Sequence, residues 1–66
     1  MPVVRITLLK GTPIEAKRKL VEGITNAFVT SLGKSPDSVN IYIDEITADN
    51  VGKGGAIVSE SGPPKV

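Results

Sequence analysis

The chain has 66 residues, a formal net charge of +1, and neither cysteine nor histidine. The two absences exclude a thiolate nucleophile, a Ser-His pair, and a zinc site or other metal site built from the usual nitrogen and sulfur ligands. The small charge and the single Phe and single Tyr exclude an electrostatic or base-stacking surface for nucleic acid.

The first predicted element is a β-strand over residues 3–9, a segment rich in β-branched and aliphatic side chains. Successive side chains of a strand point to opposite faces, so Val4, Ile6 and Leu8 share one face. Gly11 follows and ends the strand.

A helix is predicted over residues 14–32, where apolar residues recur every three or four positions. The preceding residues carry a helix-start pattern: Thr12 as the N-cap, Pro13 in the first turn, and Glu15 completing a capping box. Gly33 is expected to end the helix.

A second strand is predicted over residues 39–45, with Val39, Ile41 and Ile43 on one face. The strand-helix-strand order favours parallel pairing with a right-handed crossover, and places the helix on one face of a two-stranded sheet. We therefore expect a β-α-β unit.

The last third of the chain holds three glycines between residues 51 and 56. A phosphate-binding loop would need a helix after its Gly-Lys pair, and no helix-forming stretch follows here. The segment instead predicts a short hairpin or a bulge with close backbone approach. Residues 59–66 are expected to be a tail that frays or reaches a neighbouring subunit.

The small size predicts self-association. A chain of this length buries only about 60% of its unfolded surface. Ordering the chain costs roughly 1.5 kcal/mol per residue. Disulfides and the usual metal sites are unavailable, so contacts with other copies remain as the source of stability. The sequence shows no signal-peptide pattern and no apolar run long enough to span a membrane, so we expect a cytoplasmic protein without a membrane partner.

Pro2 is the candidate catalytic residue. If Met1 is removed, Pro2 becomes an N-terminal secondary amine, which no internal residue provides. An α-amino group has a pKa near ~8, and an apolar pocket lowers it. Such an amine would be a free base at neutral pH, where a general base works best. The structural alternative is that Pro2 is simply a small residue at a strand edge.

Together these features resemble the 4-oxalocrotonate tautomerase family over nearly the whole chain. The residues that carry the resemblance are Met1-Pro2, Leu8-Leu9-Lys10-Gly11, Ser38-Val39, Glu45 and Asn50-Val51-Gly52-Lys53-Gly54-Gly55.

The resemblance implies an α+β fold in one tautomerase-like domain over residues 1–66. In this fold a β-α-β subunit with a C-terminal hairpin dimerises into a four-stranded sheet with the helices on one face. It also implies a homo-oligomer, a hexamer built as a trimer of dimers, and a cofactor-independent isomerase. In such an enzyme Pro2 moves a proton between the enol and keto forms of a 2-oxo acid or related enol.

Three positions depart from the family pattern. Thr12 and Asn40 stand where family tautomerases have arginines that bind the substrate carboxylates, and Val51 stands where an aromatic residue is usual. We predict these three as substrate-binding positions, with neutral hydrogen bonds from Thr12 and Asn40 and an apolar wall from Val51. Thr12 as a helix cap and Asn40 as an interface residue are the structural alternatives.

Other cations are candidates for the role of the missing arginines, namely Arg5, Lys10 and Lys53. Each is also consistent with an ordinary solvated surface charge. The sequence is consistent with three functions: an isomerase with an atypical substrate, one subunit of a heterohexameric enzyme, or a non-catalytic assembly of the same fold.

Overall fold

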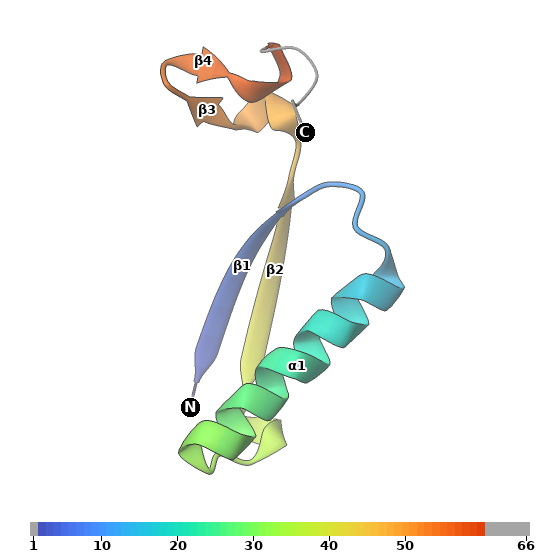
Figure 1. Cartoon of the computed structure of the whole chain (residues 1–66), viewed down its shortest axis with the longest axis vertical. Coiled ribbons are helices and arrows are strands. Elements are labelled where there is room, and N and C mark those ends of the chain that lie inside the picture. The colour runs from blue at the N-terminus through green and yellow to red at the C-terminus, as the bar shows by residue number, and fades with distance from the viewer. Residues whose placement is uncertain (1, 61–66) are drawn as a thin grey trace.

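The computed structural model describes residues 2–60, in which a β-α-β unit is followed by a small hairpin (Figure 1). The first three elements are β1 (Val3–Leu9), α1 (Ile14–Leu32) and β2 (Asn40–Ile46). Two short strands, β3 (Gly52–Lys53) and β4 (Ala56–Ile57), form the hairpin. Residues 61–66 of the predicted tail lie outside the described residues. No helix within residues 2–60 is long and apolar enough to cross a membrane.

The two long strands are parallel, as the β-α-β order predicts. Their register runs from Val3 opposite Asn40 to Leu9 opposite Ile46. Alternate side chains of β1 are half-buried and exposed, as expected for a sheet covered on one face. The half-buried face includes Ile6. The helix α1 runs beside the two long strands (Figure 1). The predicted bounds of β1 and α1 are confirmed.

The predicted helix cap, Thr12, is wrong. Pro13, with φ −67° and ψ 154°, has extended backbone and is itself the N-cap, and no side chain caps the helix. Helix hydrogen bonding therefore begins one residue later than expected, with the carbonyl of Pro13 accepting from Ala16 and Lys17. The Thr12 hydroxyl instead donates a long bond of 3.5 Å to the carbonyl of Leu9.

The second strand is shifted by one residue from its predicted bounds of 39–45. A 3-10 turn, Pro36–Ser38, precedes the strand. The backbone N–H of Val39 donates to the carbonyl of Pro36 and closes this turn, so the strand begins at Asn40. At the other end of the helix, Gly33 adopts the left-handed conformation with φ 66°, and the predicted stop is confirmed.

The hairpin predicted from the glycines is present. Gly52 pairs with Ile57 and Lys53 with Ala56 in antiparallel register. Gly54 and Gly55 form the turn with φ 61° and 83°, values that favour glycine.

Within residues 2–60 no side chain is fully buried, and large apolar residues remain exposed, including Val3 at 54% and Leu9 at 56%. The radius of gyration is 15.5 Å, against about 11 Å for a compact chain of this length. The excess arises because the hairpin stands beyond the end of the sheet (Figure 1). Much apolar surface is thus left available to neighbouring molecules.

An ion pair joins the helix to the sheet. The Lys17 Nζ lies 2.8 Å from Oε1 of Glu45. The hydrogen bond from Lys17 lowers the pKa of Glu45. Partial desolvation raises this pKa, but the charge of Lys17 and a hydrogen bond from the backbone of Gly11 lower it further. Glu45 therefore links the β1–α1 connection to the end of β2.

Replacing Glu45 by Gln is expected to lower the melting temperature at neutral pH. A carboxyl whose pKa is lower in the folded state contributes stability above its unfolded pKa, about 4.3 for Glu, and that contribution disappears as the pH falls through the folded pKa. The difference in melting temperature between wild type and Glu45→Gln should therefore vanish at low pH. Thermal unfolding from acid to neutral pH measures this, with the exposed carboxyl variant Glu22→Gln as the control. A difference that persists in acid would contradict the assignment.

Candidate active site

Pro2 and Asn40 lie together at the start of the two parallel strands. The backbone N–H of Asn40 donates a 3.0 Å hydrogen bond to the carbonyl of Pro2. Both residues are half-buried. The Asn40 side-chain amide donates to the carbonyl of Ser38 at 3.2 Å, so the turn before β2 holds this amide in place. Pro2 is therefore anchored through its carbonyl, on the side away from its nitrogen.

Thr12 and Val51 lie at the opposite end of the sheet. Thr12 follows the end of β1, and Val51 lies between the end of β2 and the hairpin. The seven residues of β1 separate this end from Pro2 by roughly 20 Å. One chain therefore brings together Pro2 and Asn40 of the predicted site, but not Thr12 or Val51.

The three candidate cations occupy different places. The Arg5 guanidinium lies over the ring of Tyr42, 5.5 Å from its centroid, on the sheet face away from the helix. Lys53 lies in β3 and is exposed. Lys10 directly follows β1, and its backbone N–H continues the ladder by donating to Ile46 at 2.8 Å.

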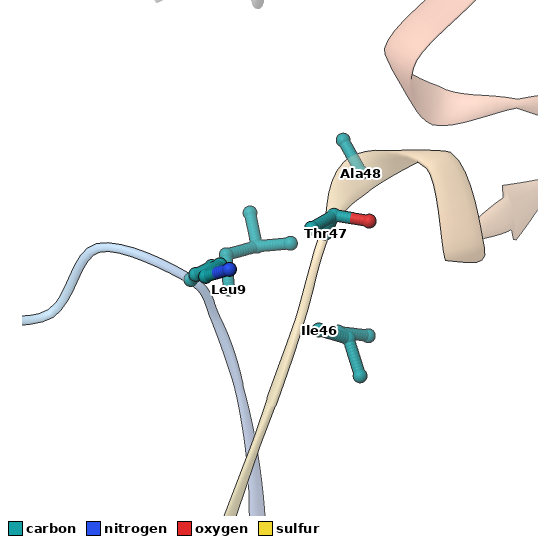
Figure 2. Close-up of a pocket in the computed structure, with 5 residues that line it drawn as sticks. Leu9, Ile46, Thr47 and Ala48 are labelled. Carbon is teal, nitrogen blue, oxygen red and sulfur yellow. The ribbon is translucent and has the colours of Figure 1, made fainter.

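A hollow lies where the two parallel strands end. It is lined by Leu9, Lys10, Ile46, Thr47 and Ala48. Figure 2 shows the Leu9 side chain extending from the end of β1 towards the segment in which the other three labelled residues follow one another. We call this the strand-end hollow. Its side-chain lining is apolar apart from the hydroxyl of Thr47 and the ammonium of Lys10.

This hollow was not predicted from the sequence. The signal was available, because the carboxyl ends of parallel strands meet at one edge of a sheet, and the residues after each predicted strand must then lie together. The sequence indicated Lys10 only as a candidate cation, without connecting it with Ile46, Thr47 or Ala48. It also missed the ion pair between Lys17 and Glu45, which depends on how the helix lies across the sheet.

The architecture defines a class of protein: a parallel β-α-β unit with a projecting C-terminal hairpin and a proline at the head of its first strand. Residues 2–61 match the family model described as "Tautomerase enzyme". The chain belongs to this family, within the 4-oxalocrotonate tautomerase group of the tautomerase superfamily.

Curated relatives support the same conclusion. Probable tautomerase K2 of Dickeya dadantii is 43% identical over 61 residues, which cover 91% of each chain. The 2-hydroxymuconate tautomerase of Bacillus subtilis is 33% identical and covers 91% of this chain and 97% of its own. These relationships support a tautomerase-type isomerase activity for this protein.

A solved structure shares the fold. The heterohexameric 4-oxalocrotonate tautomerase of Chloroflexus aurantiacus superposes with a TM-score of 0.83 at 26% identity, covering 94% of this chain and 100% of its own. Its reported assembly shows that a chain of this fold can function among unlike subunits.

Proposed function

We propose that this protein is a cofactor-independent tautomerase in which the amine of Pro2, freed by removal of Met1, is the general base. The substrate is a 2-oxo acid or a related enol. The Pro2 nitrogen accepts the proton of the enol hydroxyl, and the resulting ammonium returns a proton to carbon, which gives the keto form. The observation that carries the proposal is the position of Pro2 at the head of β1, half-buried and anchored through its carbonyl.

The active form in this proposal is a homo-oligomer, built as a hexamer from three dimers, with residues 1–66 as one tautomerase-like domain. The family match over residues 2–61 supports the domain assignment. The separation of Pro2 from Thr12 and Val51 supports a site completed by more than one copy, because the seven-residue strand β1 holds the two groups apart within one chain. Mass spectrometry under native conditions should show six copies.

Substrate binding in this proposal differs from the arginine pattern of the resembled family. Thr12 and Asn40 supply neutral hydrogen bonds and Val51 supplies an apolar wall. Neutral hydrogen bonds are roughly half as strong as charge-assisted ones, so a dicarboxylate is held weakly. The proposed substrate is accordingly a monoacid or an uncharged enol.

The pH dependence of ketonisation tests the base. We expect kcat/KM for phenylpyruvate enol to rise with pH through a single pKa below ~8 and then to level off, because only the free amine accepts the proton. The rate above the spontaneous reaction is measured from acid to mildly alkaline pH. A rate that does not change over this range would contradict a base of this kind.

A heterohexamer is the second candidate. The similarity to the heterohexameric enzyme of Chloroflexus aurantiacus favours it, as does the replacement of both arginines in this chain. In that case a partner chain supplies the arginines, and this chain supplies pocket walls. Purification from the native host followed by native mass spectrometry distinguishes the two assemblies. A complex of six identical chains supports the homohexamer, and a complex that contains a second chain of similar length supports the heterohexamer.

A further inference from the structure

The two halves of the candidate site lie at opposite ends of the same strand. Pro2 precedes β1, while Lys10 and the strand-end hollow follow it, and β1 is seven residues long. Because β1 is extended over all seven residues, its two ends cannot meet within one chain. A second copy running antiparallel along β1 would do so, because its strand end would then lie beside the strand start of the first.

The free edge of β1 suits such a copy. Within residues 2–60, β2 is the one strand that pairs with β1, so the other edge of β1 presents backbone groups outwards. An apolar, β-branched edge strand is a template for pairing with another chain. β1 is of this kind, with Arg5 as its single charged residue. The free edge of β2 is less suitable, because Asp44 and Glu45 lie in that strand and carboxylates disfavour edge pairing.

The register follows from the length of the strand. A two-fold axis at Ile6 lets two β1 strands overlap completely, with Val3 opposite Leu9 and Arg5 opposite Thr7. No like charges then stand directly opposite each other. The ladder between β1 and β2 extends to Lys10 through its bond to Ile46, so the same register carried one residue further places Pro2 opposite Lys10 of the second copy. Directly opposite residues of an antiparallel pair lie on the same face.

We propose that Lys10 of a second copy is the substrate-binding cation beside Pro2, and that it takes the carboxylate of a monocarboxylic 2-oxo acid or its enol. This inference rests on the proposed function. Lys10 is the charged member of the five residues that line the strand-end hollow, and it supplies one positive charge. Leu9, Ile46 and Ala48 supply apolar surface for the rest of the molecule. One cation and an apolar wall fit one carboxylate on a small apolar body.

The Lys10 ammonium has a second effect in this arrangement. A positive charge near an amine disfavours protonation of that amine and lowers its pKa. Lys10 already acts on its surroundings in this way, since its charge contributes to lowering the pKa of Glu45. Lys10 of the second copy is thus expected both to bind the substrate and to keep Pro2 in its free-base form.

Cysteine pairs test the register without measuring activity. The chain has no native cysteine, so introduced thiols report only on the pairs chosen. The double variant Val3→Cys/Leu9→Cys should form disulfide-linked dimers under mild oxidation, because the two positions stand opposite each other across the axis. The control Val3→Cys/Thr7→Cys uses the same face of the same strand and should remain monomeric on a denaturing gel. Cross-linking of the control instead would overturn the register.

Kinetics test the role of Lys10. Lys10→Gln should raise KM for phenylpyruvate enol about tenfold to a hundredfold, the usual effect of losing a hydrogen bond to a charged group. It should also raise the pKa seen in the kcat/KM profile, which a merely structural role would not do. Lys10→Arg should restore most of the binding, and Lys19→Gln, an exposed lysine on α1, should leave KM unchanged.

The outcomes separate this inference from the proposed function. If Pro2→Ala is inactive but Lys10→Gln keeps the wild-type KM and pKa, the base stands and the role of Lys10 is wrong. If Pro2→Ala keeps full activity, the proposed function itself fails, whatever the cysteine pairs show. A raised KM together with dimers from Val3→Cys/Leu9→Cys supports the inference.

Discussion

Replacing Pro2 by Ala is expected to reduce kcat/KM for phenylpyruvate enol by about 10²- to 10⁴-fold, the range usually lost with a general base. After removal of Met1 this variant carries a primary amine in place of a secondary one, at the same point of the chain. The loss should appear mainly in kcat, because Pro2 is assigned to proton transfer and not to holding the substrate. Steady-state ketonisation at several substrate concentrations measures both constants.

Two controls accompany that result. The circular dichroism spectrum of Pro2→Ala and the number of copies in its native assembly should match those of wild type. The reason is that the anchoring bond runs from Asn40 to the backbone carbonyl of residue 2 and does not need the proline ring. The effect of Pro2→Ala should also be independent of which enol is assayed. Equal rates for wild type and Pro2→Ala would remove Pro2 from the mechanism.

Restoring the arginines should produce the second large effect. Thr12→Arg/Asn40→Arg is expected to raise kcat/KM for 2-hydroxymuconate by roughly two to four orders of magnitude, because two charge-assisted hydrogen bonds to its carboxylates would each be worth about 1.5–3 kcal/mol. The side-chain bonds that are lost are local ones, to the carbonyls of Leu9 and Ser38. The fold should therefore tolerate both changes.

Lysine provides the matched control for the arginine variant. Thr12→Lys/Asn40→Lys adds the same two charges without the planar fork that binds a carboxylate bidentately, so a smaller gain is expected. Activity on phenylpyruvate enol, which has one carboxylate, should rise less than activity on 2-hydroxymuconate in both double variants. A folded arginine variant with no gain on the dicarboxylate would contradict the assignment of positions 12 and 40 to substrate binding.

Local patterns predict the elements of this chain well. The alternation of residues 3–9 and the apolar spacing of residues 14–32 give β1 and α1 with their bounds. The errors occur at the starts of elements, where the backbone conformation of a single residue decides which residue caps the helix or begins the strand. The extended ψ of Pro13 displaces Thr12 from the cap, and the turn closed by Val39 delays β2.

The candidate site is harder to predict from the sequence than the helix and strands are, because it depends on how far apart its residues lie in the folded chain. Parallel pairing alone brings Pro2 and Asn40 together, and the sequence predicts that pairing. The length of β1 keeps Thr12 and Val51 away from Pro2, so their part in one site depends on other copies, which one chain does not show. The strand-end hollow lies between these cases, since parallel pairing predicts its location but not its shape.

In the proposed mechanism the base is the free amine of Pro2, so the covalent state of the N-terminus decides whether that base exists. Intact-mass measurement of the active protein should give the mass of the chain without Met1. Any fraction that retains Met1 should be inactive once separated, because its Pro2 nitrogen is an amide without basicity. Full activity in a purified fraction that retains Met1 would contradict the claim.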